Sequence, residues 1–420
     1  MAMAHKLEAP TFKQSLPVYG VVDGMFYSYD SFIEGFQCAF KPNKNLYVEN
    51  TQFKNGEAWV KVVVGDKGWE SDLAEMPRGR AIIPFWISTQ FGEEAHVKRT
   101  VARVINALTR SERDRPPLVD QAIGVSPYTE LRQDKDGSGG GPDDREVGEA
   151  LEAELIARDL IGLDKFLILG AHSFEGLQKI KEKVPDVLPV TATPLFAEHI
   201  QNELFQKKII DPKNTRIVAL DKGSLQQCIM LSEQLDLPPD EHIISFDKNR
   251  KGHNMVGDLM LQYGDPKDMV GKDMIIYDDI IDTFGSMKET CKALRNIYKC
   301  KSITIIGTHG VLSHPARGNA INSLDENGNH QPIVDRIIMS DSLVRAKYAF
   351  KEIDRVSIIP VESMLGNMTQ FFAEMTAEQM MGNEMTRDYI LDPQDKELVW
   401  EDFKERYAIK DRIHLPIDQK

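Results

Sequence analysis

Short apolar runs alternate with stretches of helical periodicity along most of the 420-residue chain. The runs are bounded by turn residues and contain many β-branched residues, a pattern typical of strands buried in a parallel sheet. They predict strands at 81–88, 121–125, 166–169, 216–220, 242–246, 274–277 and 302–307. Apolar residues three and four positions apart predict helices at 93–108, 145–160, 225–235 and 287–298. Strands that alternate with helices predict an α/β fold with mostly parallel sheets flanked by helices.

The two ends of the chain follow other patterns. Residues 46–64 alternate as strand, turn and strand around an Asn55-Gly56 turn signal, which predicts a hairpin. Residues 1–47 are weakly patterned and are predicted to form an extension packed on the core. Interspersed acids and bases predict an exposed helix at 396–407.

The net charge of −14 argues against nucleic acid or an anionic membrane as the main partner, since both require a basic face. No apolar run approaches the length that crosses a bilayer, and residues 1–10 contain no signal-peptide core. Four cysteines, Cys38, Cys228, Cys291 and Cys300, show no metal-ligand spacing and suggest reduced thiols. These features predict a cytoplasmic protein.

A polar loop joins the predicted strand 274–277 to the predicted helix at 287–298. The start of a helix presents free amides and the positive end of its dipole, so it suits a phosphate, and Gly285 lets the backbone approach closely. Thr283 and Ser286 can add hydroxyl donors. Asp278 and Asp279 would repel a phosphate, which leaves sugar hydroxyls or a hard divalent cation as their partners. An acidic helix cap without a ligand is the alternative reading of the loop.

The loop resembles a known binding motif. Asp278 and Asp279, then Asp282 and Thr283, then Gly285 and Ser286 follow the ribose-5-phosphate loop of the type I phosphoribosyltransferase fold, which ribose-phosphate diphosphokinases share. The resemblance implies an N-terminal extension (1–47), two phosphoribosyltransferase-like domains (48–196 on the ATP side, 197–355 with the ribose-phosphate loop) and a return segment with a helical extension (356–420). It assigns acceptor binding to the loop residues Asp278, Asp279, Asp282, Thr283, Phe284, Gly285 and Ser286.

Other segments resemble the same family in chain order. The family's adenine-stacking pentad matches Phe53, Asn55 and Glu57, and its ATP-contacting pair matches Arg132 and Gln133. A histidine that helps to hold ATP-bound magnesium matches His172, and an Asp-x-Gly-Gly motif matches Asp221, with Ser224 as a departure. The catalytic Lys-x-Arg loop matches Lys248 and Arg250. A Thr-His-Gly motif matches residues 308–310, and the segments together span about residues 50–316.

By this resemblance the protein is similar to Mg²⁺-dependent diphosphokinases of nucleotide biosynthesis. These transfer the β,γ-diphosphoryl group of ATP to the anomeric hydroxyl of ribose 5-phosphate and release AMP. The family also implies a homodimer or a larger homo-oligomer, in which Phe53 reaches the ATP site of a neighbouring subunit. Three alternatives remain open: the same chemistry on a larger acceptor such as ADP-ribose, a phosphoribosyltransferase, and a non-catalytic regulatory paralogue.

Phe284 departs from the family, which has a small residue at this place in the loop. Either the ring points away from the phosphate, or it reshapes the pocket for a ribose with a larger 5-substituent.

Overall fold

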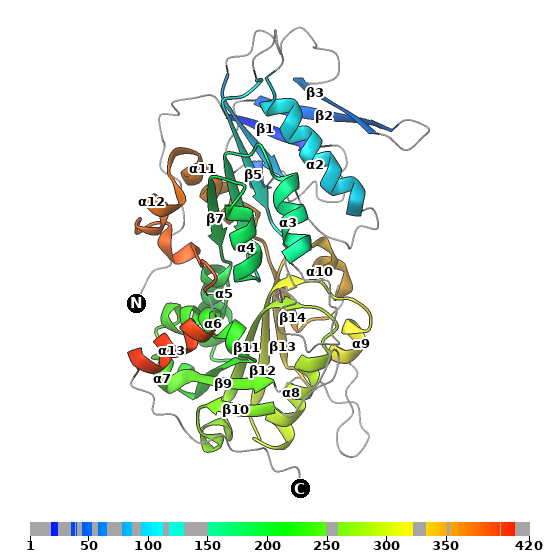
Figure 1. Cartoon of the computed structure of the whole chain (residues 1–420). Helices are drawn as coiled ribbons and strands as arrows, with labels where there is room; N and C mark the ends of the chain where they lie inside the picture. Colours follow the sequence, from blue (N-terminus) through cyan, green and yellow to red (C-terminus); the bar gives the residue numbers. More distant parts are fainter. Residues whose placement is uncertain are drawn as a thin grey trace, which may run out of the picture. The chain divides into compact units, whose positions relative to one another are not determined.

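The computed structural model describes residues 18–23, 35–37, 39, 44–52, 58–64, 78–85, 94–111, 117–129, 150–248, 259–321, 333–350, 353–394 and 396–407. The chain divides into two compact units. Unit 1 comprises Met1–Val190 and Val361–Pro393, and unit 2 comprises Thr191–Pro360 and Gln394–Lys420. Each unit is built around one sheet, drawn in Figure 1.

Unit 1 contains a seven-stranded sheet with the order β3-β2-β1-β4-β5-β6-β7. The strands are β1 (Val18–Asp23), β2 (Lys44–Gln52), β3 (Ala58–Val64), β4 (Arg80–Pro84), β5 (Gln121–Ser126), β6 (Lys165–Leu169) and β7 (Asp186–Val190). All neighbours are parallel except β2 and β3. The helices are α2 (Glu94–Thr109), α3 (Ala150–Asp159), α4 (Phe174–Lys181), α11 (Glu362–Glu374) and α12 (Ala377–Met381), with a 3₁₀ turn at Arg387–Tyr389.

Unit 2 contains a second seven-stranded sheet with the order β10-β9-β8-β11-β12-β13-β14. The strands are β8 (Thr215–Ala219), β9 (Ile243–Lys248), β10 (Leu259–Tyr263), β11 (Asp273–Ile281), β12 (Ser302–Gly310), β13 (Arg336–Ser340) and β14 (Val356–Ile359). The helices are α5 (Thr193–His199), α6 (Lys222–Gln234), α7 (Pro239–His242), α8 (Gly285–Asn296), α9 (Ala316–Ile321), α10 (Val344–Ala349) and α13 (Lys396–Arg406). A π-helical turn at Ile200–Phe205 and 3₁₀ turns at Pro212–Asn214 and Pro266–Met269 complete the unit.

The two sheets share one topology. In each, the first strand leads outward to a parallel neighbour and then to an antiparallel edge strand, and the chain returns to build four parallel strands on the other side. The connection between β2 and β3 therefore occupies the same topological place as the connection between β9 and β10. The predicted α/β class, with two mostly parallel sheets flanked by helices, is confirmed.

The predicted strands and the hairpin at 46–64 are present, with Leu46 opposite Val64 and Gln52 opposite Ala58. The prediction of an extension at 1–47 is wrong for its described part. Strand β1 lies inside the sheet, paired with both β2 and β4. Its sequence, VYGVVD, is short and interrupted by Gly20, so its apolar pattern is weak although its backbone is central.

The predicted boundaries between segments also shift. Unit 2 begins at Thr191, before α5, and keeps β14 at 356–359, a stretch that was predicted to belong to the return segment. The return segment divides, because Val361–Pro393 joins unit 1 while α13 packs in unit 2. Helix α13 was predicted to be exposed, but one side of it is buried. Phe403 is 1% exposed and its ring contacts those of Tyr263, Trp400 and Tyr407.

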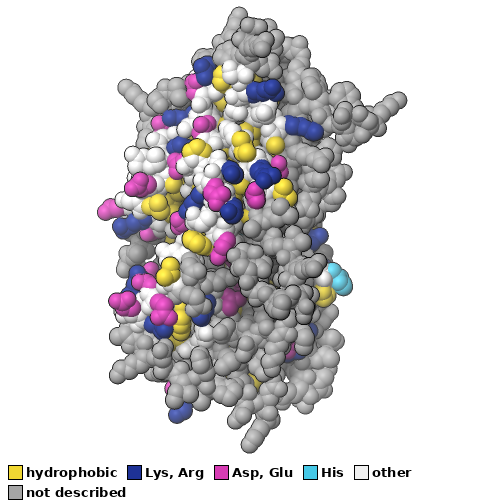
Figure 2. Space-filling view, in the orientation of Figure 1, with side chains coloured by type: hydrophobic (Ala, Val, Ile, Leu, Met, Phe, Trp, Pro, Cys, Tyr) yellow, Lys and Arg dark blue, Asp and Glu magenta, His cyan; other side chains and the backbone are white. Residues whose placement is uncertain are grey.

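Charged side chains on the surface are mixed in sign. Exposed pairs such as Arg158–Glu154 and Lys179–Glu182 lie on α3 and beside α4. Figure 2 shows Lys and Arg side chains interspersed with Asp and Glu side chains over the described part of one face. The acidic balance is therefore not gathered in one patch on that face. Among the described residues, no helix combines the length and the hydropathy needed to span a membrane.

Candidate functional site

Strand β11 continues through the acidic pair. The sequence predicts that the strand ends at Tyr277, but β11 runs to Ile281, with Asp278 paired to Gly307 and Ile280 paired to His309. It extends because β12 continues beside it and supplies backbone partners. Side chains alternate along a strand, so Asp278 and Asp279 leave it on opposite faces. Asp278 is half-buried, whereas Asp279 is 7% exposed.

Backbone and side-chain contacts tie the loop after β11 to the segment after β12. The Ser313 amide donates to Asp282 Oδ1 at 3.3 Å, and Asn319 Nδ2 donates to the Thr283 carbonyl at 2.9 Å. The Leu312 amide donates to the Ile281 carbonyl at 3.0 Å. Asp282 and Thr283 are thus held in place, with the Thr283 side chain exposed.

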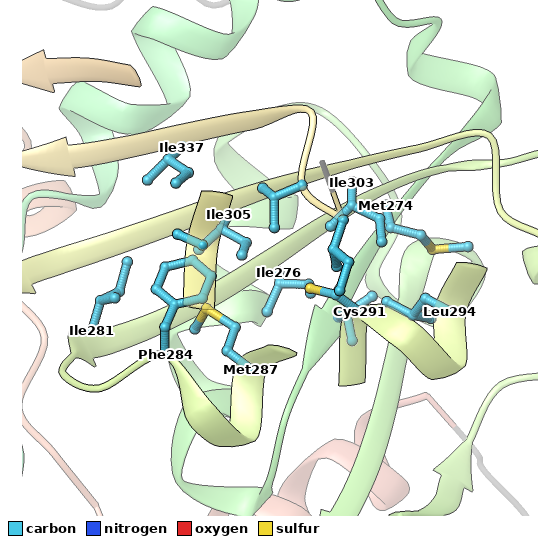
Figure 3. Close-up of a cluster of buried hydrophobic side chains, with 14 of the residues drawn as sticks. Met274, Ile276, Ile281, Phe284, Met287, Cys291, Leu294, Ile303, Ile305 and Ile337 are labelled. Atoms are coloured by element: carbon cyan, nitrogen blue, oxygen red, sulfur yellow. The ribbon is translucent and has the colours of Figure 1, made fainter. Parts of the chain in front are cut away.

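Phe284 lies in the hydrophobic core. Its side chain is 3% exposed and belongs to the cluster formed by β11, β12, β13 and α8. Figure 3 shows the ring directed from the start of α8 toward Ile305, beside Met287. The alternative in which this ring reshapes the acceptor pocket is therefore wrong. The Phe284 side chain is therefore unavailable to line a pocket at the start of α8.

The backbone of Phe284 has a left-handed conformation, with φ 65° and ψ 6°. This conformation costs a non-glycine residue about 1–2 kcal/mol. Burying a phenylalanine side chain stabilises the fold by about 1.5–3 kcal/mol, which offsets that cost. Burial of the ring can therefore stabilise the left-handed backbone conformation of Phe284.

The start of α8 is open to a ligand. Its N-cap residue, Phe284, makes no side-chain capping bond, and its first turn contains no acid. The Thr283 hydroxyl lies 3.4 Å from the Gly285 amide, a long contact. A Cβ at Gly285 would meet only Thr283 Oγ1, at 3.5 Å, among its described surroundings. The fold itself therefore gives no steric reason for glycine, whereas a closely bound phosphate would. The Ser286 side chain lies outside the described residues.

Asp221 lies at the end of β8, next to β11 in the sheet. It caps α6 by accepting the Ser224 amide at 3.2 Å, and the Ser224 hydroxyl completes the capping box. Ser224, which replaces a glycine of the family motif, thus helps to cap α6. The buried Cys228 thiol lies near both acids: burial raises its pKa well above the usual range, and the charges of Asp278 and Asp221 raise it further. Strands β8 and β11 flank the point where the strand order reverses, the preferred ligand position in such sheets.

Lys248 is the last residue of β9, on the other side of β8. Because these strands are parallel, the backbone of Lys248 reaches the same carboxyl edge as Asp221 and Asp278. Its side chain and Arg250 lie outside the described residues. Three candidates predicted from separate parts of the sequence therefore gather at one edge of the unit 2 sheet.

The ATP-side candidates belong to unit 1. His172 lies at the carboxyl end of β6, half-buried, directly before Ser173, which caps α4 through the Gly176 amide at 3.0 Å. The remaining candidates, Phe53, Asn55, Glu57, Arg132 and Gln133, lie outside the described residues.

The sequence did not predict a buried hydroxyl chain beneath this edge of the unit 2 sheet. The Tyr277 hydroxyl lies 2.9 Å from Thr193 Oγ1 and 3.4 Å from Thr308 Oγ1, and Thr193 Oγ1 lies 2.7 Å from Thr191 Oγ1. Burial raises the pKa of Tyr277 to about 12. Thr308 was visible in its motif, but nothing in the sequence links it to Thr191 or Thr193.

A second contact near this edge involves the histidine of the same motif. His309 is 1% exposed and its Nδ1 lies 2.9 Å from Ser342 Oγ. Ser342 follows β13, so this bond joins the end of β12 to the end of its neighbour. The histidine of the Thr-His-Gly motif therefore links the carboxyl ends of β12 and β13.

Comparisons with known proteins agree with this geometry. Residues 190–335 match the phosphoribosyl transferase domain family. A ribose-phosphate pyrophosphokinase of Thermotoga maritima is 27% identical over 58% of this chain and 67% of its own length. One from Clostridium perfringens is 30% identical over 42% of this chain and 51% of its own length. The chain thus matches between about half and two thirds of these relatives.

A solved structure shares the fold. The phosphoribosylpyrophosphate synthetase of Mycobacterium smegmatis superposes with a TM-score of 0.60 at 19% identity, over 86% of this chain and 99% of the other. The chain thus has two mostly parallel sheets of one topology, and strands β8 to β12 of the one in unit 2 lie within the stretch that matches the phosphoribosyl transferase domain family. Over the matched residues the chain is similar to ribose-phosphate pyrophosphokinases.

Proposed function

We propose that the protein transfers the β,γ-diphosphoryl group of ATP to the anomeric hydroxyl of a 5-phosphorylated ribose and releases AMP. The hydroxyl oxygen attacks the β-phosphorus, the bond to the α-phosphate oxygen breaks, and the hydroxyl proton leaves to solvent. The observation that carries the proposal is the convergence at the carboxyl edge of the unit 2 sheet, where an uncapped helix start lies beside two carboxylates. The similarity to ribose-phosphate pyrophosphokinases supports this chemistry at the edge.

The acceptor would bind at the loop after β11. The backbone at Gly285, with Thr283 and Ser286, would hold the 5-phosphate at the positive end of α8. Asp278 and Asp279 would accept hydrogen bonds from the ribose hydroxyls. Their positions on opposite faces of β11 make Asp278, the more exposed of the two, the stronger candidate for direct contact.

ATP would bind with Mg²⁺ as cofactor. Mg²⁺ prefers oxygen ligands and is usually held by one or two carboxylates together with substrate phosphates. Asp221 fits this donor set, with His172 proposed to help place the metal-bound ATP. Among the described residues, no group of three metal-ligating side chains is present. Bound there, Mg²⁺ would neutralise the charge of the transferring group.

The remaining roles follow the family resemblance. Lys248 and Arg250 would meet charge that develops during transfer. Phe53, Asn55, Glu57, Arg132 and Gln133 would bind ATP, with the first three acting on a neighbouring subunit in a homodimer or a larger homo-oligomer. The free thiols Cys228, Cys291 and Cys300 accord with the cytoplasmic location that we propose.

The acceptor that we propose is ribose 5-phosphate. The case for a larger acceptor such as ADP-ribose rested on the Phe284 ring lining the pocket, and that ring is buried in the core. Both compounds nevertheless belong in the assay, because each carries a phosphorylated 5-position.

The test is to incubate the protein with MgATP labelled at the β-phosphate and with each acceptor. We expect AMP to form in proportion to acceptor and the label to pass to the sugar. ADP as the stoichiometric product would exclude a diphosphokinase. Consumption of phosphoribosyl diphosphate with a free base would indicate a transferase. Inactivity with every acceptor, together with stimulation of an active synthetase, would indicate a regulatory paralogue.

A further inference from the structure

Phe284 combines a left-handed backbone, a buried ring and a position directly before α8. Its φ is 65° and its side chain is 3% exposed. Bulky residues avoid this region of conformational space unless the surrounding structure holds them there. The glycine that follows does not have a positive φ, so residue 284 itself makes the turn into the helix.

The residues around Phe284 are fixed as well. Asp282 is bonded to the Ser313 amide, and the Thr283 carbonyl accepts from Asn319 Nδ2. Asn319 Oδ1 also lies 3.4 Å from Lys288 Nζ on α8. The loop is therefore held on both sides of the turn by groups of the protein itself.

Leu312 repeats the arrangement on the facing segment. It has φ 53°, is 7% exposed and belongs to the same core cluster as Phe284. Its amide donates a hydrogen bond to the carbonyl of Ile281, which lies shortly before Phe284 in the sequence. The segments that follow β11 and β12 thus each turn at a left-handed apolar residue anchored in the core. Leu312 also shows that a buried leucine holds a left-handed conformation at the neighbouring turn.

We propose that Phe284 is a positioning residue for the acceptor. The ring, anchored in the core, holds the left-handed turn that directs the first amides of α8 toward the 5-phosphate before the acceptor arrives. A glycine would permit the turn but would also permit other conformations, which binding would then have to order. This inference rests on the proposed function, since it requires the acceptor phosphate to lie at α8. The ring itself does not touch the acceptor.

The experiment compares Phe284→Gly, which removes the anchor, with Phe284→Leu, which retains an apolar one. Met287→Ala is the matched control, because Met287 is 4% exposed in the same cluster and lies in the first turn of α8. Calorimetry measures the binding of ribose 5-phosphate without ATP. Steady-state kinetics give kcat and both KM values, and thermal unfolding reports the loss of core packing.

We expect Phe284→Gly to weaken ribose 5-phosphate binding and to raise its KM by at least about tenfold, or about 1.4 kcal/mol. The KM for ATP should change by less than about twofold, because ATP binds elsewhere. Phe284→Leu should restore acceptor binding to within about threefold of the wild type. Met287→Ala should lower the Tm while acceptor binding stays within about threefold.

Three results would overturn the proposal. Unchanged acceptor binding in Phe284→Gly would make the ring a packing group alone. Equal weakening in Met287→Ala would assign the effect to general loss of core packing. A Phe284→Leu variant as weak as Phe284→Gly would show that anchoring is not what matters. A wild-type protein that binds no 5-phosphorylated ribose would instead refute the proposed function, and the inference with it.

Discussion

The Lys165 ammonium donates hydrogen bonds to the carbonyl oxygens of Phe372 and Met375, at 2.7 and 2.8 Å. Lys165 begins β6, whereas the two carbonyls end α11, more than two hundred residues later in the chain. The ammonium also lies 4.9 Å from the centre of the Phe372 ring and 3.7 Å from Asp186 Oδ2. The late segment of the chain is thus bonded to the start of β6 in unit 1.

Replacement of this ammonium should destabilise unit 1. We expect Lys165→Met, which keeps most of the apolar stem, to lower the free energy of unfolding by about 2–4 kcal/mol, because it leaves two carbonyls without their donor and Asp186 without its ion-pair partner. Urea unfolding measures the loss. Lys179→Met is the control: Lys179 pairs with Glu182 at the surface, and its loss should cost less than about 0.5 kcal/mol. Similar losses in the two variants would contradict this assignment.

Tyr277 should make stability fall at alkaline pH. Burial raises its pKa in the folded protein from 10.0 to about 12. Above about pH 10 the unfolded protein releases this proton while the folded protein keeps it. The contribution is therefore complete below pH 10 and is lost as the pH rises toward 12, by about 3 kcal/mol in all.

The measurement for Tyr277 is urea unfolding at several pH values between 8 and 12. Tyr277→Phe should be about 1 kcal/mol less stable than the wild type at pH 8, since it loses the bond to Thr193. It should also lose less stability on going to pH 12. Parallel pH profiles for the two proteins would show that Tyr277 does not titrate in this range.

Lys248 and Arg250 should act mainly in the transition state. We expect Lys248→Ala and Arg250→Ala each to raise the activation free energy of the kcat step by about 2–4 kcal/mol, and so to lower kcat, with small changes in either KM. The reason is that the charge these residues are proposed to meet develops only during transfer. Steady-state kinetics with both substrates varied provide the measurement. A loss in KM as large as that in kcat would assign the two residues to substrate binding.

The ATP site should be shared between subunits. We expect a mixture of inactive Phe53→Ala and inactive Lys248→Ala proteins to regain activity, since a hybrid oligomer contains one intact site. Subunit exchange is followed by native mass spectrometry, and each variant alone is the control. Exchange without any return of activity would exclude shared sites.

The sequence predicts best those elements whose local pattern and environment agree. Strands such as β8, β11 and β12 are buried on both faces, so their continuous apolar runs are visible in the chain. Strand β1 was missed because its place in the sheet depends on pairing with β2 and β4, and Gly20 interrupts its pattern. The end of β11 was missed because acidic residues favour loops unless a neighbouring strand continues beside them.

The candidate site shows the same limit. The sequence contains the order of Asp278, Asp279 and Gly285, and the fold brings them to one edge with Asp221. It cannot give the direction of the Phe284 ring, because that depends on the sign of φ at a residue that normally has a negative one. Asn319, which holds the Thr283 carbonyl, belongs to no motif and is found only through the structure.

The chain passes between the two units three times, after Val190, after Pro360 and after Pro393. No single cut of the polypeptide can therefore release either unit whole. A truncation before Val361 would leave unit 1 without α11 and unit 2 without α13. To express either unit by itself, its late segment would have to be joined to its early segment by a new linker. A single gene fragment therefore encodes neither unit whole.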